Sequence, residues 1–100
     1  DPEQIYLIPK MIKDERIRIK VGAIAIIEEI KEKNPAVLKK IVPPLIELLK
    51  SSEKNIRGDA AYALEIIADP DSRDALLEAL NKEQDPQVRE FIEDALKSIK

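Results

Sequence analysis

One amphipathic segment contains the pattern on which the rest of the chain is built. Residues 55–67 read Asn-Ile-Arg-Gly-Asp-Ala-Ala-Tyr-Ala-Leu-Glu-Ile-Ile. Apolar side chains recur in it three and four positions apart, which predicts a helix with one apolar stripe. The stripe is narrow and rich in small residues, and it consists of Ile56, Ala60, Ala63, Leu64 and Ile67.

The same pattern recurs on both sides of this segment. Val88-Arg89 matches Ile56-Arg57 at a shift of 32 residues, and the apolar positions that follow also align. A shift of 39 residues in the other direction places Ile17-Arg18 on the same pair. A capping acid or amide followed by proline, which is typical of a helix start, occurs at Asp1-Pro2, Asn34-Pro35, Asp69-Pro70 and Asp85-Pro86. Periods of this size with two helices per unit predict an α-solenoid.

The repeats divide the single domain of residues 1–100 into three hairpins of about residues 1–33, 34–68 and 69–100. We therefore expect an all-α, right-handed α-solenoid of three stacked antiparallel helical hairpins, without strands. Pro9 should kink the first helix and Pro43-Pro44 should kink or split the third, because proline cannot donate to the preceding turn.

The second helix, from about residue 15 to residue 33, is apolar nearly all round. One stripe holds Ile17, Val21, Ile24 and Ala25, and the other holds Ile19, Ala23, Ile26 and Ile30. A helix of this kind expects neighbours on both sides. We therefore expect either that the chain is the C-terminal part of a longer solenoid or that it self-associates through the N-terminal hairpin.

The repeated motif resembles the HEAT-repeat family, and most closely its bilin-lyase-type (PBS lyase) subgroup. Residues 85–89, Asp-Pro-Gln-Val-Arg, followed by Ala95-Leu96, carry the resemblance, and residues 55–64 carry it equally well. The resemblance covers the whole chain. It implies an armadillo-type curved stack whose first helices are convex and whose second helices are concave, and it implies a protein that holds other proteins.

The composition argues against several other functions. Lys and Arg total 17 against 20 Asp and Glu, a net charge of −3, whereas nucleic-acid binders show a basic excess. The chain has no Cys and no His, so it lacks thiolate metal sites and the commonest general base. We expect no enzyme activity, cofactor or metal. No signal peptide or membrane-spanning apolar run is visible, so we expect a cytoplasmic protein. The abundance of Ile, Lys and Glu is typical of a thermophile, or of a genome of low GC content.

Three arginines occupy one position of the repeat: Arg18, Arg57 and Arg89. They could line an anion-binding groove, or they could tie neighbouring repeats together as a structural ladder, for which the planar guanidinium is well suited. The ladder is favoured, because each unit of a repeat protein packs mainly against its neighbours. The nearest candidate partners by pattern are Asp14, Asn55 and Asp85.

Residues of the second helices that lie off the core stripes should meet on the concave face as a partner-binding wall. They include Lys20, Ala23, Asp59, Tyr62, Ile66 and Asp94. Tyr62 is either an exposed anchor, because tyrosine supplies contact area and a polar tip at low entropic cost, or it packs onto the neighbouring hairpin. We expect Phe91 to pack, since an exposed phenylalanine is a liability.

The function favoured by these patterns is a non-enzymatic protein–protein interaction scaffold that binds its partner on the concave face. The resemblance also implies an alternative, a lyase-like or enzyme-associated accessory repeat protein. A nucleic-acid-binding solenoid is the third possibility, but the basic first third of the chain lacks the interleaved aromatic residues that stack on bases.

Overall fold

The computed structural model describes the backbone of residues 2–99 and the side chains of residues 4–99; the expected cap at Asp1 lies outside this range. The elements are, in order, 3-10 helix η1 (Pro2–Tyr6), α1 (Leu7–Ile12), α2 (Ile17–Lys33), 3-10 helix η2 (Pro35–Ile41), α3 (Val42–Leu48), α4 (Lys54–Ile67), 3-10 helix η3 (Pro70–Ser72), α5 (Arg73–Lys82) and α6 (Pro86–Ser98). No strand occurs among the described residues. The predicted all-α class is confirmed.

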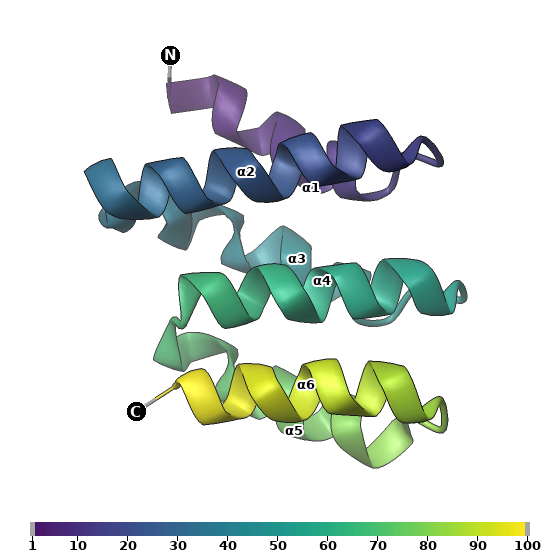
Figure 1. The fold of residues 1–100 in the computed structure, drawn as a ribbon. Helices are drawn as coiled ribbons and strands as arrows, with labels where there is room; N and C mark the ends of the chain where they lie inside the picture. The colour runs from purple at the N-terminus through teal and green to yellow at the C-terminus, as the bar shows by residue number, and fades with distance from the viewer. Residues whose placement is uncertain (1, 100) are drawn as a thin grey trace.

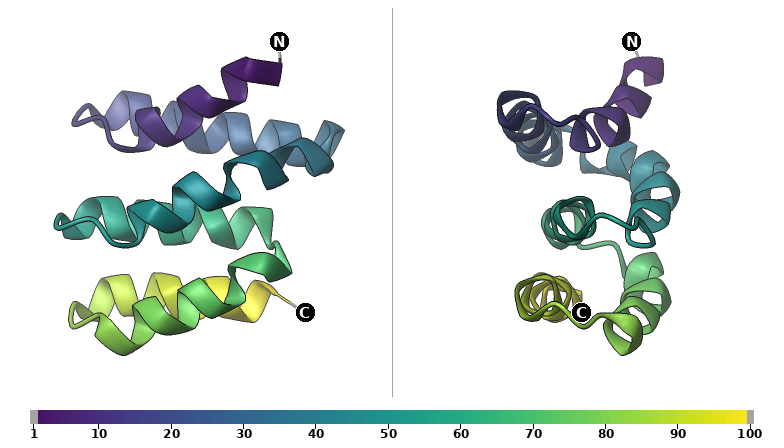
Figure 2. Two further views of the ribbon diagram at one scale, coloured as in Figure 1. Left: turned by 180° about the vertical axis from the view of Figure 1, so that it is seen from behind. Right: turned by 90° about the vertical axis from the view of Figure 1, so that its right-hand side faces the viewer.

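The helices lie in two layers. Helices α1, α3 and α5 form one layer, and α2, α4 and α6 form the other, as the right-hand view of Figure 2 shows. Within the second layer, α4 packs far more extensively against α6 than against α2 (Figure 1). The candidate site lies where α2 and α4 pack less closely against each other.

A continuous aliphatic core joins the two layers. The stripe predicted for residues 55–67 faces it: Ala60, Ala63 and Leu64 are fully buried and Ile56 is nearly so. The matching positions Val88, Ile92 and Ala95 of α6 are buried as well. The 32-residue shift between these helices is therefore confirmed.

The 39-residue shift predicted for α2 is wrong. Ile17 and Val21, which it equates with core positions, are 76% and 61% exposed, whereas Ala23 and Ile27 are fully buried. A shift of 37 residues matches buried with buried, because it sets Ala23 on Ala60 and Ile27 on Leu64. The error has a physical cause: in a helix that is apolar nearly all round, periodicity does not single out the buried face.

The prolines act at helix starts and not as kinks. Pro9 is the third residue of α1, and Pro43-Pro44 are the second and third residues of α3. The first N–H groups of a helix have no partner within it, so the missing proline N–H costs no hydrogen bond there. The chain upstream of each proline forms a 3-10 helix, so the predicted kink at Pro9 becomes an interruption before Leu7, and the predicted split near Val42 is confirmed.

Side-chain caps define the start of the last hairpin and its second helix. Asp85 accepts hydrogen bonds from the N–H groups of Gln87 and Val88, both at 3.0 Å, and Asp69 accepts one from Asp71 at 2.8 Å. Both aspartates were predicted as caps and are confirmed. A helix also starts at the predicted Asn34-Pro35, although Asn34 makes no side-chain cap bond.

Candidate interaction groove

A groove with a volume of about 650 Å³ runs over the layer formed by α2, α4 and α6. All three helices contribute to it. Its principal walls are formed by Ile17, Lys20, Val21, Ile24, Tyr62 and Phe91. It therefore lies on the face that the sequence predicted for partner binding.

Aliphatic side chains of α2 form one wall of the groove and are unusually exposed. Ile17 and Val21 are one helical turn apart, so they project from the same side of α2. Each exposes more than half of its surface, and Tyr62 across the groove is 37% exposed. Ile17 and Val21 were not predicted to lie on the surface, because the incorrect 39-residue shift placed both in the core.

The opposite wall is an aromatic pair. The rings of Tyr62 and Phe91 meet edge to face with their centroids 6.0 Å apart. Gly58 lies against the Phe91 ring, and a Cβ atom at that position would lie 3.4 Å from it, which is within ordinary van der Waals contact. Phe91 packs as predicted, while Tyr62 combines the two alternatives: it packs on Phe91 of the neighbouring hairpin and still presents a face to the groove.

Two ion pairs cross the groove and link its helices. Lys20 Nζ lies 3.3 Å from Asp59 Oδ2 and joins α2 to α4, and Lys54 Nζ lies 3.6 Å from Asp85 Oδ2 and joins α4 to the start of α6. Lys20 and Asp59, both predicted for the partner-binding wall, are thus brought together.

None of the other three residues predicted for the partner-binding wall lines the groove. Ala23 is fully buried and offers no surface to a partner, so its prediction is wrong for the same reason of register. Ile66 is half-buried against the core, and Asp94 is half-exposed on α6. Neither of these two lines the groove.

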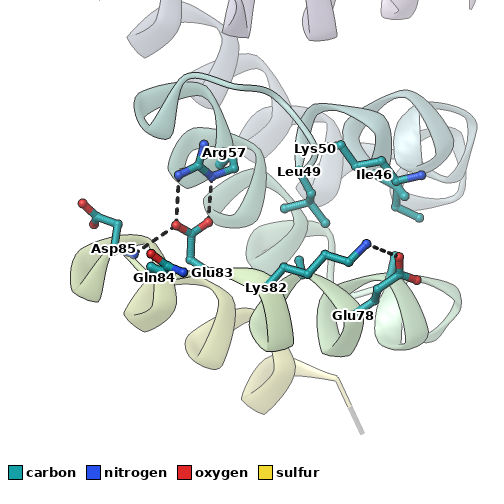
Figure 3. Close-up of a pocket in the computed structure, with 11 residues that line it drawn as sticks. Ile46, Leu49, Lys50, Arg57, Glu78, Lys82, Glu83, Gln84 and Asp85 are labelled. Carbon is teal, nitrogen blue, oxygen red and sulfur yellow. Dashed lines mark hydrogen bonds and ion pairs between the residues drawn. The ribbon is translucent and has the colours of Figure 1, made fainter.

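Arg57 forms a bidentate ion pair between successive hairpins. Its Nε and Nη2 atoms donate to the two carboxylate oxygens of Glu83 at 2.7 and 3.0 Å (Figure 3). Its Nη1 atom donates to the Ser51 carbonyl at 2.9 Å. This hydrogen-bonded pair lowers the pKa of Glu83 and raises that of Arg57. The ladder role was predicted, but the partner is Glu83 and not Asn55 or Asp85.

The other two arginines differ from Arg57 and from each other. Arg89 donates to the carbonyls of Leu80 and Glu83, both at 2.8 Å, and so satisfies free carbonyls at the end of α5. Arg18 is exposed and makes no hydrogen bond to another described residue, so its assignment to the ladder is wrong. With the 37-residue shift, Lys20 and not Arg18 occupies the position of Arg57.

A second cleft, of about 600 Å³, lies between α3 and α5 (Figure 3). Four of its six charged side chains pair with one another: Arg57 with Glu83, and Lys82 with Glu78 at 3.1 Å. The pairing makes this cleft a junction between hairpins, in contrast to the exposed apolar walls of the groove.

Among the side chains of residues 4–99, no group of three or more His, Cys, Asp or Glu is placed to hold a metal ion. None of the described helices is long and apolar enough to span a bilayer.

Two layers of helices, in which one pattern of buried residues recurs along the chain, are typical of α-helical repeat proteins. Comparison with protein families identifies the particular kind. A family model described as HEAT repeats matches residues 6–97, and the chain belongs to that family, as its motif predicted. No curated protein matches the chain.

Proposed function

We propose that this HEAT-repeat protein is a non-enzymatic scaffold that binds another protein in the groove over α2, α4 and α6. The observation that carries the proposal is the exposure of Ile17, Val21 and Tyr62 within one groove. Grouped apolar side chains on a protein surface mark interaction sites. Tyrosine is also enriched among the residues that contribute most to binding energy.

The finer features of the architecture and context belong to the same proposal. The contacts of α1 with α2, α3 with α4 and α5 with α6 support three hairpins, and membership of the HEAT-repeat family supports their stacking as a right-handed superhelix. The exposed Tyr6, Leu7 and Ile26 of the first hairpin support self-association or stacking at the N-terminal end. Composition and motif support a cytoplasmic, thermophilic origin and a place near the bilin-lyase-type subgroup.

Replacing Tyr62 with alanine is expected to abolish or strongly reduce partner capture, because it removes the exposed aromatic anchor of the groove. The test immobilises the wild-type protein and the Tyr62→Ala variant, passes lysate of the encoding organism over each, and compares the captured proteins by quantitative mass spectrometry. A specific partner should fall about tenfold or more, the usual cost of losing one anchor side chain.

The matched control is Leu77→Ala. Leu77 is a large apolar side chain on α5, outside the groove, with 46% exposure. Circular dichroism should show that both variants remain folded. The proposal fails if Tyr62→Ala captures the same proteins as the wild type, or if Leu77→Ala loses them equally.

A further inference from the structure

We infer that the groove recognises a partner segment that combines large apolar side chains with flanking lysines or arginines. The inference rests on the proposed function and specifies the chemistry of the occupant. It is drawn from the apolar walls of the groove and from the charges around them.

The apolar contacts come from both sides of the groove. Ile17 and Val21 project from α2, and the edge of the Tyr62–Phe91 pair faces them from α4 and α6. Water must leave these surfaces when an apolar side chain enters, which is favourable in proportion to the apolar area buried. A purely polar segment would gain nothing there.

The charged side chains that line the groove carry one more negative than positive charge. Two lysines and three carboxylates line the groove: Lys20, Lys54, Glu28, Asp59 and Asp85. Both lysines are already paired, with Asp59 and Asp85. Glu28 makes no ion pair with any other described residue, and Asp94 adds a half-exposed carboxylate to the same helix layer.

This charge pattern selects among occupants. A basic segment would place a cation against the unpaired Glu28 carboxylate, and an acidic segment would place like charges together, which disfavours association. Nucleic acid is disfavoured for the same reason. A second copy of the chain would bring its own excess of carboxylates to a groove-to-groove contact, since the chain has a net charge of −3.

The test uses three fluorescein-labelled peptides of about 18 residues, roughly five helical turns. The first is an amphipathic helix of leucine and lysine, the second replaces every lysine with glutamate, and the third replaces every leucine with serine. Fluorescence anisotropy measures the affinity of each. We expect the leucine–lysine peptide to bind about tenfold or more tightly than either of the others.

Two variants connect that binding to the groove. Val21→Ser removes apolar contact, and Glu28→Lys reverses the unpaired charge. Each variant should lower the affinity for the leucine–lysine peptide about threefold to tenfold. The matched controls are Leu77→Ser on α5 and Glu47→Lys on α3, both exposed and outside the groove. The controls should bind as the wild type does.

Three results would overturn the inference. They are equal or tighter binding of the leucine–glutamate peptide, groove variants that bind no differently from their controls, and a wild-type dimer in sedimentation that Val21→Ser dissociates, which would assign the groove to a second copy. If any of these occurs while Tyr62→Ala still loses its captured proteins, the scaffold proposal stands and only the chemistry of the occupant is wrong. If Tyr62→Ala retains them, the scaffold proposal itself fails.

Discussion

Replacing Arg57 with alanine is expected to lower the free energy of unfolding by about 3 kcal/mol, because it strands a buried carboxylate. The Glu83 side chain is only 5% exposed and receives two of its hydrogen bonds from Arg57. The same change also leaves the Ser51 carbonyl without its guanidinium donor. Urea unfolding followed by circular dichroism at pH 7 measures the loss.

A double variant separates the stranded charge from the pair itself. Replacing both Arg57 and Glu83 with methionine removes the two charges together, and buried ion pairs replaced in this way often cost little. The double variant should therefore be more stable than Arg57→Ala. If Arg57→Ala instead unfolds as the wild type does but loses partner binding, Arg57 is a binding residue and the ladder interpretation is wrong.

The loss of unfolding free energy caused by Arg57→Ala should also depend on pH, and the lowered pKa of Glu83 determines the direction of that dependence. Its pKa in the folded protein lies below the usual value of 4.5, chiefly because Arg57 donates to it. The stabilisation is therefore fully present above about pH 4.5 and is lost as the pH falls through the folded-state pKa. The difference between wild type and Arg57→Ala should shrink when unfolding is measured at progressively lower pH below 4.5.

Truncating Leu64 to alanine is expected to cost about 3 kcal/mol and to destabilise every hairpin. Leu64 is fully buried, so the change removes apolar contact and leaves a cavity. It lies in α4, which contacts α1, α2, α3 and α6. Native-state hydrogen exchange should show reduced protection throughout the chain, with a fall in the melting temperature of roughly 12–24 °C.

Leu76 provides the matched comparison, because it is an equally buried leucine in α5, whose main contacts are with η3 and α6. In a repeat array each unit depends mainly on its neighbours. Leu76→Ala should therefore reduce protection in α5 and α6 by a similar amount and leave α1 and α2 nearer to wild type. Equal loss of protection everywhere would indicate one closed cooperative globule.

The fold was largely readable from the sequence because its signals are local and repeated. Val88 and Ile56 lie in equivalent helices with one dominant apolar face each, so the 32-residue repeat gave the correct register. The proline positions likewise marked interruptions near Leu7 and Val42, although they serve helix starts and do not bend them.

The site was only partly readable, for two physical reasons. Helix α2 carries more isoleucine, valine and alanine than the core can bury, so its pattern could not show that Ile17 and Val21 face outward and Ala23 inward. The partner of Arg57 depends on how the turn after α5 comes to lie against α4, and Glu83 has no position in the repeat motif that marks it. Contacts between hairpins are set by packing that a single sequence does not record.

The central claim, that the groove over α2, α4 and α6 holds the partner, is tested most directly by the two tyrosines of the chain. Tyr62 lies in the groove and Tyr6 lies outside it, and they are 37% and 48% exposed. Hydroxyl-radical footprinting of the captured complex, compared with the free protein, reports the accessibility of each ring. Labelling of Tyr62 should fall several-fold while labelling of Tyr6 stays unchanged; protection of Tyr6 with Tyr62 still fully labelled would contradict the claim.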